Sequence, residues 1–160
     1  MRPVRPRLAT APLAVLAALA AGCGNQEAST PSACLEGAGA YVRALAAAPG
    51  AVRLGGETPI GDCLAENQDA GELASVGEAM LETATRLNAE ARAQPGGDAN
   101  LRLGYLIGAL RRGAERTEGI HSDLLRRLVV AARFAPGHRP LTPTFLDAYE
   151  RGYEAGRRHG

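Results

Sequence analysis

Few side chains in this sequence have the type and spacing that enzymatic chemistry requires. Among three histidines, only His121 has another potential metal ligand close by, Asp123. Two ligands fall short of the three or four that a zinc site needs, so we expect Ser122 or Asp123 to cap a helix there. Ser75 lacks the leading glycine of a nucleophile elbow and lies within a predicted helix. We therefore predict no catalytic residues, no metal site and no cofactor, in a protein that is not an enzyme.

Acidic side chains form a second candidate ligand set, at Asp62, Glu66, Asp69 and Glu72. A calcium loop supplies oxygen ligands at alternating positions around a central glycine. Leu64 occupies the first alternating position here. We therefore interpret the cluster as a solvent-facing acidic surface.

The clearest chemistry in the sequence is that of Cys23. A head with three arginines, within residues 2–7, precedes an uncharged stretch over residues 8–21 made mostly of Ala, Leu and Val. At about 14 residues this stretch is shorter than the roughly 20 that span a bilayer core. Small residues follow and end in Gly22-Cys23. A segment of this kind enters the translocon and is then removed by a peptidase.

In these features residues 1–23 resemble a bacterial lipoprotein precursor. The resemblance implies that the Cys23 thiol receives a diacylglyceryl group, that residues 1–22 are cleaved off, and that the acylated cysteine holds the chain at a bilayer. It implies an extracytoplasmic protein and, because Gly24 rather than Asp follows the cysteine, an outer-membrane anchor facing the periplasm if the host has two membranes. An ordinary signal peptide and a plain membrane-anchor helix are the alternatives. The resemblance does not extend beyond Cys23.

Two cysteines remain, Cys34 and Cys63. An extracytoplasmic compartment is oxidising, so we expect them to form a structural disulfide. On the chain-entropy model, a bridge across this separation stabilises the fold by about 3 to 4 kcal/mol. A metal or redox pair is the alternative, although the sequence has no Cys-x-x-Cys spacing.

The elements that position these residues are predicted to be helices. A short tether over 23–31 leads to a single α-helical domain over 32–160, where apolar residues recur at spacings of three and four. No run alternates as a strand does, and Val and Ile are sparse, so the fold class is an all-α bundle of four to six helices. The longest uncharged run beyond Cys23 is too short for a second membrane span. The first expected helix covers 34–45, and the second lies between a cap at Asp69 and its end at Gln94. The third runs from a cap at Asp98 towards Gly119, the fourth from near Ser122 to before Pro136, and the last from Thr142-Pro143 through Tyr153. A short turn starts at Thr58-Pro59.

Glycines inside two of these helices are unusual. Gly104 and Gly108 share one face of the third helix, and Gly152 and Gly156 share one face of the last. Each costs about 1 kcal/mol relative to alanine, so the four need compensation. We expect the two helices to cross tightly at these residues, because a missing side chain lets a second backbone approach. A shallow face left open for a ligand is the alternative.

Charge is nearly balanced overall but unevenly distributed. Eighteen arginines and no lysine oppose 17 acidic residues, which argues against a nucleic-acid partner. Residues 23–98 carry four arginines and eleven acids, whereas residues 99–160 carry eleven arginines and six acids. The basic half either pairs with the acidic half, in part within helices as Arg111 does with Glu115, or forms a face for an anionic partner. The candidate residues for such a face are Arg111, Arg112, Arg116, Arg126 and Arg127.

Taken together, these features predict a lipid-anchored cell-envelope protein with a non-enzymatic structural or protein-interaction role. Its expected partners are membrane lipid, through acylated Cys23, and an envelope protein. The alternative is an extracytoplasmic module that binds an anionic small molecule or envelope polymer through an Arg-rich helical face. A pocket lined by Tyr105, Tyr149 and several arginines would favour the ligand module, and a filled core with a flat exposed face would favour protein interaction.

Overall fold

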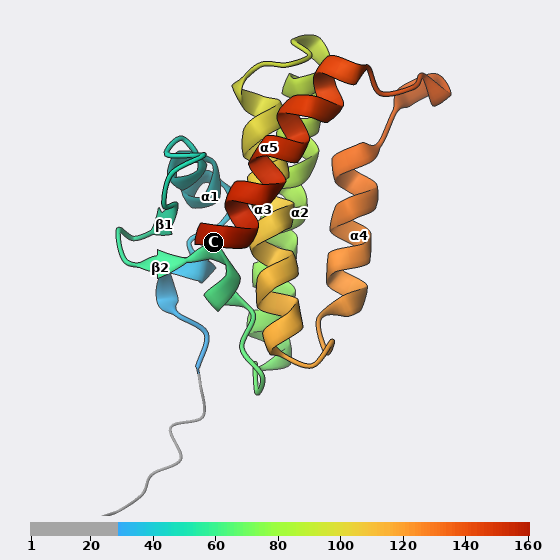
Figure 1. Cartoon of the computed structure of the whole chain (residues 1–160). Coiled ribbons are helices and arrows are strands. Elements are labelled where there is room, and N and C mark those ends of the chain that lie inside the picture. Colours follow the sequence, from blue (N-terminus) through green and yellow to red (C-terminus); the bar gives the residue numbers. More distant parts are fainter. Residues whose placement is uncertain (1–28) are drawn as a thin grey trace, which may run out of the picture.

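The structure, a computed structural model, describes residues 29–160 and consists of an all-α bundle with one small hairpin (Figure 1). The predicted signal peptide and the acylation site at Cys23 lie outside the described residues. The α helices are α1 (Ala38–Leu45), α2 (Ala70–Ala93), α3 (Asp98–Arg116), α4 (Ser122–Arg133) and α5 (Pro143–His159). Short 3-10 helices η1 (Ser32–Leu35), η2 (Ile60–Cys63) and η3 (Pro136–His138) and the antiparallel strands β1 (Arg53–Leu54) and β2 (Thr58–Pro59) complete the fold.

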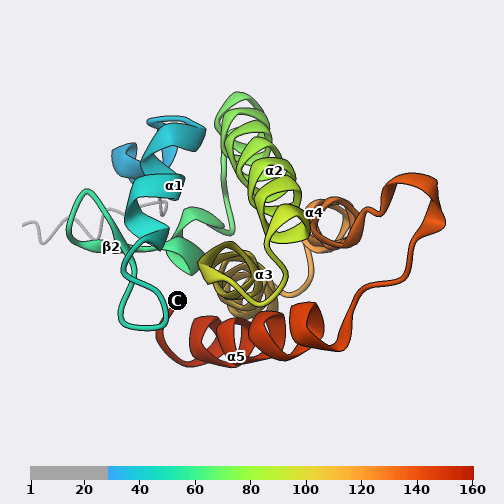
Figure 2. The ribbon, with the colours of Figure 1, turned by 90° about the horizontal axis from the view of Figure 1, so that it is seen from above.

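Helix α3 lies at the centre of the bundle. Figure 2 shows it between α2 and α5, with α1 and the hairpin on one side of α2 and α4 on the other. The most extensive packing is between α3 and α5, while α4 packs on α2 and α3. No helix within residues 29–160 is long and apolar enough to cross a bilayer.

Helix α2 forms where the periodicity predicts it. Asp69 Oδ1 accepts hydrogen bonds from the backbone N–H of Gly71 at 2.7 Å and of Glu72 at 3.4 Å, which satisfies two groups that every helix start leaves unpaired. Thr142 caps α5 in the same way, through Phe145 N–H at 3.1 Å. The caps predicted at Asp69 and Thr142 are therefore confirmed.

Two other predicted caps are wrong. Helix α3 begins at Asp98 itself, after Gly97, and α4 begins at Ser122, after His121; neither start has a side-chain cap. In the turn before α4, Glu118 (φ 50°) and Gly119 (φ 81°) are both left-handed. This turn places His121 at the cap position, one residue earlier than the sequence pattern suggests, which leaves Ser122 and Asp123 inside the helix.

The first predicted helix is interrupted. Gly37 has φ 78°, a conformation that breaks a right-handed helix, so the chain forms η1 and then α1. Thr58-Pro59 lies in strand β2 instead of starting a turn, and η2 follows it at Ile60. Both differences arise in the segment before α2, where η1 and α1 pack mainly on α2 and η2 packs on α3.

The disulfide predicted between Cys34 and Cys63 is confirmed. It joins η1 to η2 with a Cα–Cα distance of 5.6 Å, and both cysteines are buried. Tyr41 OH donates a hydrogen bond of 2.9 Å to the carbonyl oxygen of Cys34. The N-terminal segment is therefore attached covalently to the segment that precedes α2.

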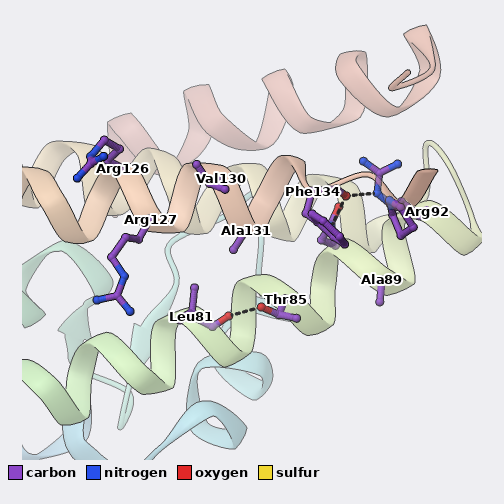
Figure 3. A pocket seen from close by; sticks show the side chains of 11 residues that line it. Leu81, Thr85, Ala89, Arg92, Arg126, Arg127, Val130, Ala131 and Phe134 are labelled. Carbon is purple, nitrogen blue, oxygen red and sulfur yellow. Dashed lines mark hydrogen bonds between the residues drawn. The ribbon is translucent and has the colours of Figure 1, made fainter. Parts of the chain in front are cut away.

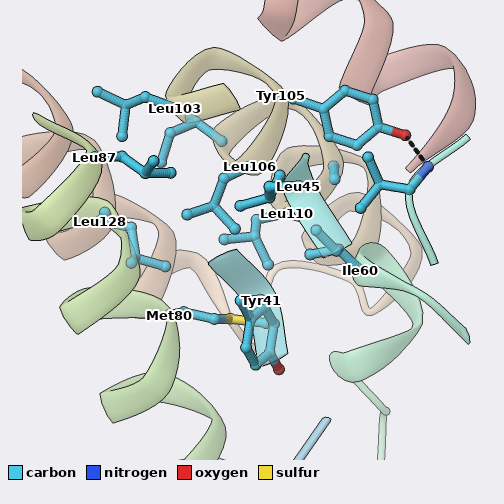
Figure 4. Packing of buried hydrophobic residues seen from close by; sticks show 14 of the residues in the cluster. Tyr41, Leu45, Ile60, Met80, Leu87, Leu103, Tyr105, Leu106, Leu110 and Leu128 are labelled. Atoms are coloured by element: carbon cyan, nitrogen blue, oxygen red, sulfur yellow. Dashed lines mark hydrogen bonds between the residues drawn. The ribbon is translucent and has the colours of Figure 1, made fainter. Parts of the chain in front are cut away.

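The core is filled by leucines from several helices (Figure 4). Leu87, Leu103, Leu106 and Leu128 are all fully buried. Tyr105 is also buried, and its hydroxyl accepts a hydrogen bond of 3.2 Å from Val52 N–H, which ties the loop before β1 to α3. Tyr105 is thus a core residue.

Helices α3 and α5 cross at the four glycines that the sequence singles out. All four are buried. A Cβ atom at any of them would overlap a backbone carbonyl oxygen of the opposite helix, so the two backbones leave no room for a ligand. The overlapping pairs are Gly104 with Tyr149, Gly108 with Tyr153, Gly152 with Leu101 and Gly156 with Tyr105.

Candidate interaction groove between two helices

An apolar groove runs along the seam between α2 and α4. The upper hollow, at the C-terminal ends of both helices, has a volume of about 570 Å³ (Figure 3). The lower hollow, at their N-terminal ends, has a volume of about 540 Å³, and the two share Leu81 and Arg127. The upper hollow also includes Thr85, Ala131 and Phe134, while Gly77 and Leu124 line the lower one. We call the whole feature the α2–α4 groove.

Large apolar side chains of the α4 segment are exposed along this groove. Ile120 is 63% exposed, Val130 65% and Phe134 60%, and all three line the groove. Leu125, Leu128 and Ala132 are the buried residues of α4. Helix α4 therefore has an apolar core side and a second apolar side that no other helix within residues 29–160 covers, the kind of patch that marks an interaction site.

The end of α4 is held firmly beside α2. Asn88 Nδ2 donates a hydrogen bond of 2.8 Å to the carbonyl oxygen of Phe134, and Arg92 Nε donates one of 2.5 Å to the same oxygen. Arg92 Nη2 also donates to the Arg133 carbonyl oxygen at 3.3 Å. These bonds satisfy carbonyl groups that a helix end leaves open. They hold the backbone of Phe134 in place while its ring stays exposed.

Arginines lie along the groove and just beyond its upper end, where Arg92 of the groove lines an adjoining hollow together with Arg139. The Arg92 guanidinium carbon lies 5.7 Å from the centre of the Phe145 ring. Partial burial, and secondarily the nearby Arg139, lower the pKa of Arg92. Arg126 pairs with Asp123 at 2.9 Å, whereas Arg127 and Arg139 form no ion pair with any residue in 29–160.

The five arginines predicted as an anionic-partner face fall into two groups. Arg111 pairs with Glu115 at 3.3 Å and Arg116 with Asp62 at 2.5 Å. Arg112 Nη1 donates bonds of 3.0 Å to the carbonyl oxygens of Arg158 and Gly160. Arg111 therefore pairs within α3, Arg116 connects α3 to η2, and Arg112 connects α3 to the end of α5. Only Arg126 and Arg127 lie at the groove.

The remaining chemical candidates have structural roles. His121 is buried, its Nδ1 shares a hydrogen bond of 2.8 Å with Thr117 Oγ1, and burial lowers its pKa. Ser75 Oγ donates to the Gly71 carbonyl oxygen at 3.0 Å, as a helical serine often does. Across residues 29–160, no group of three or more His, Cys, Asp or Glu side chains could hold a metal ion.

The aromatic residues do not form the pocket that would favour a ligand module. Tyr149 lies between Phe145 and Tyr153 along α5, with ring centres 6.3 and 6.5 Å apart. Burial is the main cause that raises its pKa to about 12. Tyr105 is enclosed in the core. Neither side chain lines the α2–α4 groove.

The sequence pattern did not indicate the exposed apolar residues that line the groove. Apolar spacing in the helix expected over 122–134 places Leu124, Leu125 and Leu128 on one stripe, and Val130 and Phe134 fall outside it. The available signal was that apolar residues of this short helix occupy more of its circumference than one buried face requires.

No family model matches this chain, and no curated protein or solved structure matches it either.

Proposed function

We propose that this chain is a lipid-anchored cell-envelope protein with a non-enzymatic role in protein interaction, and that the α2–α4 groove is its docking surface. One observation carries the docking proposal: Ile120, Val130 and Phe134, three large apolar side chains more than half exposed, line a single groove. A groove between two helices is a common receptor for the apolar face of a partner helix.

The anchor is supported by the lipoprotein-like segment that ends at Cys23. Thr30 is buried, and its hydroxyl accepts a hydrogen bond of 2.8 Å from Gln68 Nε2, just before α2 begins. The anchored chain therefore enters the domain near the start of α2, which is also the lower end of the groove. A fully extended chain from Cys23 to Thr30 spans at most about 25 Å. We propose extracytoplasmic attachment, at the outer membrane facing the periplasm where the host has two membranes.

A second candidate is a binding module for an anionic small molecule or envelope polymer. The upper hollow, at about 570 Å³, has the size of a small-molecule site and combines an apolar floor with Arg127. Protein docking is the better supported of the two, because ligand pockets enclose most of their ligand. Here the anchor side chains Val130 and Phe134 are about 60% exposed.

The docking proposal is tested by photocrosslinking in native envelopes. Phe134 is replaced by a photoreactive benzoyl-phenylalanine, and Leu146, which is 40% exposed on α5, is replaced in the same way as the control. We expect one discrete protein adduct, identified by mass spectrometry, at position 134 and none at 146. Equal labelling at both positions, or adducts with lipid alone, would contradict the proposal.

The anchor is tested separately. Cys23→Ser should move the chain from the membrane fraction to the aqueous fraction, because no acyl group can then be attached. Tight membrane retention of this variant would overturn the lipoprotein assignment without affecting the groove.

A further inference from the structure

We propose that the groove receives an amphipathic helix of a partner protein, which runs antiparallel to α2 and α4 and places an acidic first turn against Arg92 and Arg139. This inference rests on the proposed docking function and adds the chemistry and direction of the partner segment.

The shape of the groove fits a helix. A Cβ atom at Gly77 would lie 3.3 Å from the Leu124 side chain, and eleven residues further along α2 Asn88 bonds to Phe134, ten residues beyond Leu124. Helices α2 and α4 are therefore parallel and in register over this stretch, which is about 15 Å long at 1.5 Å per residue. An apolar stripe with anchors at i, i+3, i+7 and i+10 spans the same length, about 15 Å.

The exposure of the groove argues for a helix over a single acyl chain. Ile120 lies at the lower end, Val130 in the upper half and Phe134 at the upper end. Each is more than half exposed, so the groove is open along its length. A helix, about 10 Å wide with its side chains, presents several apolar groups at once and can cover all three residues, which a thin acyl chain would cover less completely.

The arginines at the upper end of the groove favour a partner with acidic side chains there. Arg92 and Arg139 together line a small hollow adjoining the groove. Arg127 lies between the two halves of the groove. None of these three guanidinium groups pairs with a carboxylate among the described residues. Glu78 and Asp123 line the lower hollow, where the acidic side chains of the groove are found. Carboxylates of a partner would therefore be favoured at the upper end and disfavoured at the lower end.

Helix direction follows from the same asymmetry. Both α2 and α4 end at the upper end, so their negative dipole ends lie there together with Arg92 and Arg139. A partner helix that begins there brings the positive end of its own dipole beside the negative ends of α2 and α4, and the acidic side chains of its first turn beside Arg92 and Arg139. Asp and Glu are also the residues favoured in a first turn. An antiparallel helix with an acidic start satisfies both requirements.

The test uses two synthetic amphipathic peptides of about 16 residues with the same apolar stripe. One has three Glu in its first turn and three Lys in its last; the other has these two turns exchanged. Fluorescence anisotropy measures the binding of each peptide to the purified chain. Acylated protein is used in phosphatidylcholine nanodiscs, and protein without an acyl group is used in buffer. Empty nanodiscs are the blank. We expect the first peptide to bind at least about fivefold more tightly than the second.

Variants then locate the bound peptide. Phe134→Ala should weaken binding about 30-fold, because the variant loses an aromatic ring that the bound peptide would bury. The carbonyl oxygen that Asn88 and Arg92 hold is kept, so α4 stays in place. Arg139→Glu should weaken the first peptide about fivefold and strengthen the second. The matched controls, Leu146→Ala and Arg151→Glu on α5, should change either affinity less than about twofold.

The outcomes separate this inference from the docking proposal. Equal affinity for the two peptides, lost in Phe134→Ala, would overturn the acidic-start assignment while the groove remains a docking site. No peptide binding, together with a protein adduct at position 134, would overturn the helix as occupant and leave the docking proposal standing. Binding of dodecyl phosphate in place of either peptide, lost in Phe134→Ala, would overturn both in favour of an anionic amphiphile site.

Discussion

The α3–α5 crossing and the α2–α4 groove use helix contacts in opposite ways. At the crossing, four glycines let two backbones meet with no side chain between them. Along the groove, Val130 and Phe134 project outward and remain exposed. The crossing therefore buries the facing sides of both helices, whereas α4 keeps apolar side chains outside its contact with α2.

Arginine use follows the same division. At the crossing, Arg157 pairs with Glu115 at 2.5 Å, and Arg112 bonds the carbonyl oxygens at the end of the chain. At the groove, Arg127 and Arg139 have no acidic partner within residues 29–160. Arg112 and Arg157 are thus bonded within the crossing, whereas Arg127 of the groove and Arg139 of the adjoining hollow have no carboxylate partner among the described residues.

The largest expected effect is at the crossing. Gly108→Ala should lower the free energy of unfolding by at least about 3 kcal/mol, because the new methyl group overlaps the Tyr153 carbonyl oxygen and neither backbone can move alone. Thermal and urea unfolding measure the loss. An unchanged melting temperature would show that the two backbones are not in contact.

Loss of the Arg92 hydrogen bonds to the end of α4 should have the next largest effect. Arg92→Met removes the bonds to the Phe134 and Arg133 carbonyl oxygens and should cost about 1 to 2 kcal/mol. Hydrogen exchange should quicken at the end of α4 and stay slow in α3. Arg86→Met is the control, since Arg86 bonds only Glu90 of its own helix, and it should cost less than about 0.5 kcal/mol. Faster exchange throughout the bundle would contradict a local role for Arg92.

The same substitution type should have the opposite sign in the groove. Gly77→Ala should stabilise the chain by up to about 1 kcal/mol, since alanine favours the helix and the nearest neighbour is the flexible end of Leu124. Unfolding experiments on Gly77→Ala and Gly108→Ala under identical conditions give a matched pair. A similar loss in both would remove the contrast between the two interfaces.

Acid should loosen the α4 side first. Burial lowers the pKa of His121 below its ordinary value of 6.5. The folded chain therefore favours neutral His121, and this contribution is complete above about pH 6.5 and is lost as the pH falls toward the lower folded-state pKa. Protection at the start of α4, measured as hydrogen exchange relative to the intrinsic rate at each pH, should fall as the pH drops below 6.5, and His121→Gln should remove that dependence. A fall in protection confined to α5 would contradict the assignment.

The smallest effect is expected for the groove surface itself. Phe134→Ser should change the free energy of unfolding by less than about 0.5 kcal/mol, because the ring is mostly exposed. Leu128→Ser, at a fully buried position six residues earlier, should cost about 3 kcal/mol or more. A large loss of stability in Phe134→Ser would make its ring part of the core.

Much of the helical framework was predictable because it depends on residues close in the chain. The stripe of α2 and its Asp69 cap, the Thr142-Pro143 start of α5 and the glycine pairs are all visible as local spacing. The break at Gly37 was not predictable from apolar periodicity, since η1 and α1 continue the same pattern. The position of the α4 start depended on the left-handed turn at Glu118 and Gly119, which the residue types alone do not indicate.

The sequence by itself determined the helical class of the bundle, the cysteine pair and the residues able to form a close crossing. Only the tertiary structure decided that the glycines of α3 and α5 meet each other, that Arg116 reaches Asp62, and that Val130 and Phe134 stay uncovered. The physical reason is that periodicity shows that a face is apolar without showing what lies against it. Which faces are covered depends on how far and at what angle each helix packs, and that is set by contacts between residues distant in the chain.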